Sequence, residues 1–220
     1  MRFENASDLF RPGYLAVESG VIDFDDGYRT VAALTRMPGC RAKMVAWWFG
    51  WLGGTDQYKI WHPRDHVFSD WENRTPGSHV GSSHLVHEYL AGDDGPLFKL
   101  RINFRDPREF LDPRQYDAFD GVAICARTGS LEAPVDHGRT IHFVRNTGFG
   151  CEMRSRFFLG DLASRDPATP FTAARAAELR AQRVTPELAR RLHQHSTEEM
   201  GYLAEFLPVL YRQVTGDTTY

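Results

Sequence analysis

The chain has 220 residues, of which 42% are hydrophobic, 13% aromatic and 25% charged, and its formal net charge is -3. This composition is typical of a globular protein with one substantial core and excludes a largely disordered chain. The weak charge gives no reason to expect nucleic acid or a membrane as partner, and no apolar run approaches the length of a membrane span. We expect one domain over residues 1–220, with a core from about 14 to 214, flexible termini and a small-molecule ligand.

The sequence also bears on the compartment. Cys40, Cys125 and Cys151 lack C-x-x-C spacing, so they indicate neither a disulfide framework nor a thiolate zinc site. The first ten residues lack the basic and then apolar order of a signal peptide. We expect a cytoplasmic protein, and the oligomeric state stays open, with a homodimer among the alternatives.

Short segments rich in Val, Ile and aromatic residues, bounded by Gly, Pro, Asp or Asn, dominate the first three quarters of the chain. Those predicted as strands are YLAVESG (14–20), RTVAALTRM (29–37), QYKIWH (57–62), SSHLVHEYL (82–90), FKLRINF (98–104), GVAICART (121–128), TIHFVRN (140–146) and CEMRSRFFL (151–159).

Helical patterns lie between and after these strands. Helices are predicted over 39–52, over 172–182 and from 185 onward, where Pro208 is expected to kink or break the last one. This order predicts an α+β fold in which a curved antiparallel sheet grips a long C-terminal helix and encloses a cavity.

The stretch RLHQHSTEEM in the last helix places His195 and Glu199 one turn apart on the same face. The stripe that contains them has the spacing of a core-facing surface and comprises Leu192, His195, Glu199, Tyr202 and Phe206. Two metal-ligating residue types would then point inward together. The alternative is an ordinary solvated pair on a surface helix.

The strand SSHLVHEYL offers a second candidate ligand. Alternation places Glu88 on the same face as Val86 and Leu90. If that face turns inward, Glu88 is a buried carboxylate that needs a cation, a metal or a proton. In the opposite register, Leu85 and Tyr89 would fill the core and Glu88 would lie in water.

A third cluster is the stretch YKIWHPRDHVF, where His62 and His66 flank a Pro-Arg-Asp turn. Either imidazole could bind a metal. The alternative is a solvated loop histidine or one that is satisfied by Asp65.

Together these stretches resemble the zinc-dependent hydrolases typified by diacetylphloroglucinol hydrolase and phloretin hydrolase. The matching segments are MPGCRAKMVAWWFGW, YKIWHPRDHVF, HLVHEYL, GFGCEMRSRFFLG and HSTEEM. The resemblance implies a helix-grip core like that of Bet v 1. It also implies one Zn²⁺ per chain and hydrolysis of the carbon-carbon bond between an acyl group and a phenolic ring or diketone.

Carried over residue by residue, the resemblance implies that His66, Glu88, His195 and Glu199 hold the zinc, with His62 as the alternative to His66. A family histidine near the reacting group matches His142, whose alternative is a structural cross-strand histidine. Tyr58, eight residues before His66, would hydrogen-bond a ring hydroxyl or else simply pack in the core.

The substrate-binding positions depart from the family. Ser69 stands where the family has an asparagine, and Phe157 or Phe158 stands where it has a tyrosine. We therefore expect an aromatic or polyketide-like ketone as substrate, contacted by Ser69 and Phe157. Two other functions stay open: a zinc-assisted cyclase or isomerase, and a non-catalytic module that binds a hydrophobic ligand.

Overall fold

The computed structural model describes residues 1–219; residue 220, the last of the range expected to form one domain, lies outside them. The strands are β1 (Gly20–Asp23), β2 (Arg29–Pro38), β3 (His66–Glu72), β4 (Ser83–Glu88), β5 (Phe98–Arg105), β6 (Gly121–Ser130), β7 (Val135–Thr147) and β8 (Gly150–Ser164). The helices are η1 (Phe3–Phe10), α1 (Ala42–Trp51), α2 (Thr55–Trp61), η2 (Pro107–Glu109), α3 (Pro113–Asp117), α4 (Ala173–Arg183) and α5 (Pro186–Thr215).

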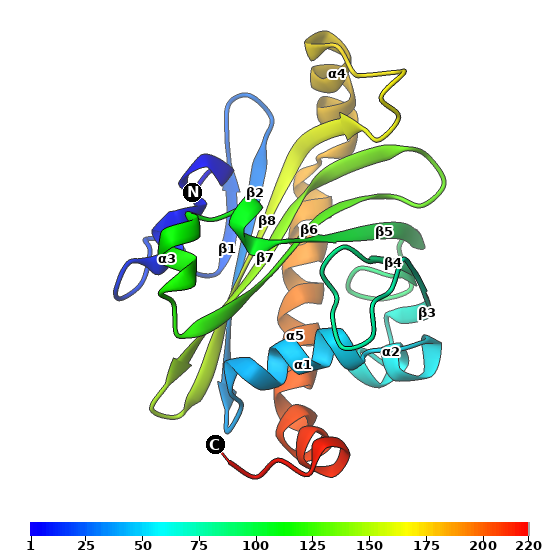
Figure 1. Cartoon of the computed structure of the whole chain (residues 1–220). Helices are drawn as coiled ribbons and strands as arrows, with labels where there is room; N and C mark the ends of the chain where they lie inside the picture. Colours follow the sequence, from blue (N-terminus) through cyan, green and yellow to red (C-terminus); the bar gives the residue numbers. More distant parts are fainter. Residues whose placement is uncertain (220) are drawn as a thin grey trace.

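All eight strands form one open sheet in the order β1-β2-β8-β7-β6-β5-β4-β3. Every neighbouring pair is antiparallel. Helix α5 runs along one face of this sheet, and η1 and α3 lie at the other end of the molecule from α2 (Figure 1). The predicted α+β plan, an antiparallel sheet with a long C-terminal helix, is confirmed.

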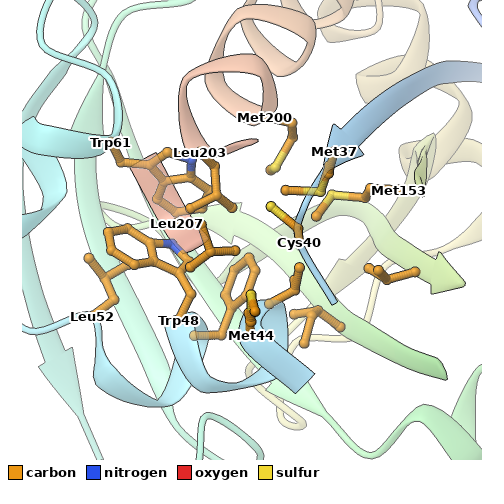
Figure 2. Close-up of a cluster of buried hydrophobic side chains, with 14 of the residues drawn as sticks. Met37, Cys40, Met44, Trp48, Leu52, Trp61, Met153, Met200, Leu203 and Leu207 are labelled. Atoms are coloured by element: carbon orange, nitrogen blue, oxygen red, sulfur yellow. The ribbon is translucent and has the colours of Figure 1, made fainter. Parts of the chain in front are cut away.

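Two hydrophobic clusters cover opposite faces of the sheet, as the alternation of side chains along a strand requires. On one face Ile124 packs with Trp48 of α1 and with Leu203 of α5, and Figure 2 shows these helices meeting there. On the other face Cys125 packs with Leu9 of η1. Helix η1, which lies within the terminus expected to be flexible, therefore packs against the sheet.

Helix α5 has sequence signals at both ends. The Thr185 side chain accepts a hydrogen bond from Leu188 N at 3.1 Å, and Pro186 occupies the first turn. Gly216 ends the helix in the left-handed conformation. Pro208 was expected to kink or break the helix, and a break is wrong, because the helix continues to Thr215.

Two predicted strands are corrected. Residues 57–62 lie in helix α2 and the turn after it, with Tyr58 and Trp61 buried three positions apart on one helical face. Residues 14–19 form no strand, and β1 begins only at Gly20. Strand β3 was not expected from the sequence. It begins at His66, directly after the turn that follows His62.

The segment before β1 is fixed instead by charge. Arg154 and Arg156 project from β8 and are 0% and 1% exposed. Glu18 pairs with both guanidinium groups, and Arg154 Nη1 also donates to the Leu9 carbonyl oxygen at 2.7 Å. These contacts satisfy the buried charges and tie the N-terminal segment to the sheet. Among the described residues, no helix combines the length and apolarity needed to cross a membrane.

Candidate metal and substrate site

A cavity of about 160 Å³ lies between the sheet and the first half of α5. Most of its wall is apolar, and its polar side chains come from α2, β4, β6, β7 and α5. Its lining includes Tyr58, His84, Glu88, His142, Phe157, His195 and Glu199.

Helix α5 presents His195 and Glu199 to this cavity, as the spacing predicted. They are 3% and 9% exposed, and Leu192 one turn earlier lines the same wall. The predicted stripe is wrong at Tyr202, which is 39% exposed, because the buried face of the helix turns toward Met200 and Leu203 instead.

The turn between α2 and β3 places His66 at the start of the strand. His66 Nδ1 is 2.8 Å from the carbonyl oxygen of Tyr58, so this nitrogen carries the proton and donates. In the neutral ring the lone pair is therefore on Nε2. That atom is buried without a hydrogen-bond partner among the described residues and approaches Glu199 Oε1 to 3.3 Å.

His62 is oriented in the opposite way. Its Nδ1 accepts a hydrogen bond from the Asp65 backbone N–H at 3.2 Å, so in the neutral ring the proton is on Nε2. This Nε2 lies 3.6 Å from Asp65 Oδ2 and from Glu198 Oε2. In this tautomer Nε2–H of His62 points toward the carboxylates as a hydrogen-bond donor. Nε2 therefore has no free lone pair.

Strand β4 adopts the register in which Glu88, Val86 and His84 turn inward, while Leu85 and His87 are half-buried. The open choice of register is settled in favour of a buried Glu88. Its carboxylate accepts a short hydrogen bond from the Tyr58 hydroxyl. His66 pairs directly with Glu88 across β3 and β4, so the strand pairing brings these two residues together.

Two groups of candidate metal donors share His195, and within each group the donor atoms lie within 4.8 Å of one another. One group is His66, His195 and Glu199, and the other is His62, Asp65 and His195. Glu88 belongs to neither group, and it lines the cavity together with His195 and Glu199. An unpartnered Nε2 lone pair next to carboxylates fits a divalent cation, for which imidazole and carboxylate are good ligands.

Asp65 was not singled out in the sequence, yet it organises the site. Its carboxylate is fully buried and accepts hydrogen bonds from Ala91 N at 2.9 Å and Gly92 N at 3.1 Å. Its Oδ2 is also 3.0 Å from His195 Nδ1. Asp65 therefore holds the His195 ring with Nε2 free for a ligand. Only the adjacency to the two histidines could have suggested this from sequence.

The electrostatics of the cluster favour a positive charge. Burial lowers the pKa of His195, but the Asp65 hydrogen bond and the Glu88 and Glu199 charges outweigh it and raise that pKa to about 9. Burial raises the pKa of Glu199, and the His66 and His195 rings more than offset this and lower it. The carboxylates thus demand a cation, which can be a proton or a metal.

Of the other predicted residues, His142 and Phe157 line the cavity, whereas Ser69 and Phe158 do not. His142 lines the cavity, with Nδ1 2.8 Å from Ser155 Oγ, and burial lowers its pKa to about 4. Phe157 lines the cavity beside it at a ring-centroid distance of 5.6 Å. Phe158, the alternative, points into the cluster on the opposite face. Ser69 is buried behind the wall, where its hydroxyl contacts the His84 ring at 2.7 Å.

Comparison with known proteins places the chain in a family named for a hydrolase. The family model of the DAPG hydrolase PhiG domain matches residues 1–212. The chain therefore belongs to the DAPG hydrolase family.

Named relatives agree with this membership. The chain is 27% identical to a 2,4-diacetylphloroglucinol hydrolase of a Pseudomonas species, over 96% of this chain and 76% of the relative. The same identity relates it to the 2,4-diacetylphloroglucinol hydrolase of Pseudomonas protegens, over 96% and 73%. Phloretin hydrolase of Eubacterium ramulus is 26% identical, over 86% of this chain and 69% of the relative.

Solved structures are more distant. A protein from Nitrosomonas europaea matches with a TM-score of 0.48 and 10% identity, over 86% of this chain and 99% of that one. A likeness at this level carries no argument about fold or function.

Proposed function

We propose that this chain is a zinc-dependent hydrolase that cleaves the carbon-carbon bond between an acyl group and a phenolic ring or diketone. Family membership supports the hydrolase class, and the relatives' names point to phenolic ketones as substrates. The observation that carries the metal assignment is His66 Nε2, which has no hydrogen-bond partner among the described residues and lies 3.3 Å from Glu199 Oε1 in a buried cluster with His195.

In this proposal His66, His195, Glu88 and Glu199 hold the zinc. His66 is preferred to His62 because its ring proton is engaged by the Tyr58 carbonyl oxygen, which leaves Nε2 as an acceptor. His62 Nδ1 is already used by the Asp65 N–H. When bound, zinc would supply polarisation of an acyl oxygen and activation of water.

The net reaction adds the hydroxyl group of water to the acyl carbon and its hydrogen to the ring carbon that carried the acyl group. His142 is proposed to move the proton to that ring carbon, because it is a cavity-facing imidazole fixed at Nδ1 by Ser155. The Tyr58 hydroxyl holds Glu88 and is proposed to contact a ring hydroxyl as well. The apolar wall excludes water from the rest of the ring.

We also propose that the sheet and α5 form a helix grip of the Bet v 1 kind. Support comes from α5 lying against the sheet and from the cavity between them. Glu88 of β4 and His195 and Glu199 of α5 line a largely apolar cavity, which suits a flat aromatic ligand.

The test is incubation of zinc-supplemented protein with 2,4-diacetylphloroglucinol, phloretin and a simple β-diketone, followed by mass spectrometry. Release of a carboxylic acid together with the deacylated ring is the expected result. An isomer of unchanged mass would indicate a cyclase or isomerase instead. Binding without any conversion would indicate a ligand-binding module.

A further inference from the structure

His84, to which no role was assigned from the sequence, lines the cavity together with Glu88, His195 and Glu199. It is 2% exposed and projects from β4 on the same face as Glu88. Its ring stacks on Trp71 at a centroid distance of 4.3 Å and meets the Tyr58 ring edge-on at 5.2 Å. The ring therefore has one well-defined orientation.

Hydrogen bonds fix which ring nitrogen of His84 carries the proton. The Ser69 hydroxyl donates to the Gly53 carbonyl oxygen at 3.3 Å, and a hydroxyl has only one proton to donate. When both Ser69 contacts are hydrogen bonds, Ser69 Oγ accepts from His84 Nε2–H at 2.7 Å, and the Gly53 carbonyl oxygen accepts a second hydrogen bond from Trp71 Nε1 at 2.7 Å. In this tautomer the lone pair lies on Nδ1, which has no hydrogen-bond partner among the residues that the structure describes.

The ring also stays neutral at working pH. Burial, with a smaller contribution from the His66 ring, lowers the pKa of His84 to about 3. A buried nitrogen lone pair without a hydrogen bond is energetically unfavourable. A bound molecule that donates a hydrogen bond to this neutral imidazole is therefore stabilised.

We propose that His84 Nδ1 accepts a hydrogen bond from a hydroxyl group of the bound phenolic ring, and that Ser69 is the positioning residue that fixes this tautomer. The proposal rests on the proposed function, because it assumes a phenol in the cavity. It replaces the expected direct contact of Ser69 with substrate by an indirect one through His84. A ligand that lacks hydroxyl donors gains nothing from this contact.

The test measures binding to the zinc-supplemented protein by calorimetry, with 1,3,5-trihydroxybenzene as probe and 1,3,5-trifluorobenzene as a ligand of similar shape without donors. His84→Phe keeps the ring that stacks on Trp71 and removes both nitrogens. We expect it to weaken trihydroxybenzene binding about tenfold, a loss appropriate to one buried hydrogen bond, and to leave trifluorobenzene binding unchanged.

Matched variants separate this role from a structural one. His79→Phe changes another buried histidine, one that is absent from the cavity wall, and should leave both dissociation constants unchanged. Ser69→Ala should weaken trihydroxybenzene binding, and Ser69→Thr, which keeps the hydroxyl, should restore it. Zinc content measured on every variant shows that the metal site is intact.

Two outcomes would overturn the inference. If His84→Phe binds trihydroxybenzene as tightly as the wild type, His84 does not accept the hydroxyl, while the hydrolase proposal stands. If the wild type does not bind trihydroxybenzene at all, the inference fails together with the phenolic substrate class. Acid release from a β-diketone would then still support a hydrolase.

Discussion

Among single residues, Asp65 has the widest set of contacts around the proposed metal. It joins the turn after α2, the loop after β4 and helix α5 through Arg64, Ala91, Gly92 and His195. Sequence analysis treated it only as a partner for a neighbouring histidine. A contact 130 positions away on α5 leaves no signal in local spacing.

Asp65→Asn should weaken zinc binding about 10- to 100-fold, because the neutral amide no longer enhances the basicity of His195 or fixes its tautomer. Competition with a chelator of known affinity measures the change. Glu198→Gln, which alters a partly exposed neighbouring carboxylate, is the control and should stay close to the wild type. Unchanged affinity in Asp65→Asn would show that Asp65 has no role in positioning His195.

His142→Ala should lower kcat at least about a hundredfold on any substrate for which acid release has been shown, since it removes the proposed proton carrier. Zinc content should not change, because His142 lies on β7 and hydrogen-bonds only Ser155 among the described residues. Full turnover in this variant would rule out the proton-transfer role.

At the scale of elements, α5 and the N-terminal segment show where local patterns succeed and fail. The start of the last helix near residue 185 and the shared inward face of His195 and Glu199 are confirmed, because capping and i, i+4 spacing are local properties. Pro208 stays inside the helix because tertiary contacts compensate. The carbonyl oxygen of Ala204, which loses its helical donor at Pro208, is 3.7 Å from Cys40 Sγ and accepts from the thiol.

This contact predicts coupling between Cys40 and Pro208. Cys40→Ala should lower the free energy of unfolding by about 1 kcal/mol more in the wild-type background than in Pro208→Ala, where a restored N–H satisfies Ala204. Urea denaturation of the four proteins in the double-mutant cycle measures the difference. Strict additivity of the two substitutions would contradict the role given to the thiol.

The ion pairs of Glu18 predict how the N-terminal segment responds to acid. Burial raises the pKa of Glu18, but hydrogen bonds from Arg154, the Leu15 backbone and Arg156 outweigh it and lower the pKa to about 2. The resulting stabilisation is complete above the carboxyl's ordinary pKa of 4.5 and is lost as the pH falls from there through about 2.

Glu18→Gln should therefore lower the free energy of unfolding by about 3 kcal/mol at pH 7, as expected when one partner of a buried pair is removed. The difference from the wild type should shrink as the pH falls below 4. Urea titrations at pH 7 and pH 3 test this. A difference that is equal at both pH values would show that the ion pairs do not stabilise the segment.

Across the whole molecule, the sequence predicted the sheet and the terminal helix because hydrophobic periodicity and turn residues act locally. It failed over 57–62, where a short aromatic segment fits a strand and a helix equally well until packing decides. It could propose His66, Glu88, His195 and Glu199 as a set only through a family resemblance, since pairing of β3 with β4 and docking of α5 are long-range events.

The dependence on long-range contacts also explains why the roles of Asp65 and His84 at the cavity were not predicted. Neither the Asp65 contact nor the tautomers of His62, His66 and His84 can be inferred from residue spacing, because each depends on a partner supplied by another turn or element. The hydrogen-bond pattern, rather than the residue types alone, distinguishes a metal-binding imidazole from a substrate-binding one.

The central claim is that the chain binds zinc through His66 and His195, and metal content measured by plasma mass spectrometry on zinc-supplemented protein tests it most directly. We predict about one zinc per chain in the wild type and in His62→Ala, and loss of zinc in His66→Ala and His195→Ala. Wild-type protein that stays metal-free after zinc is supplied would contradict the account.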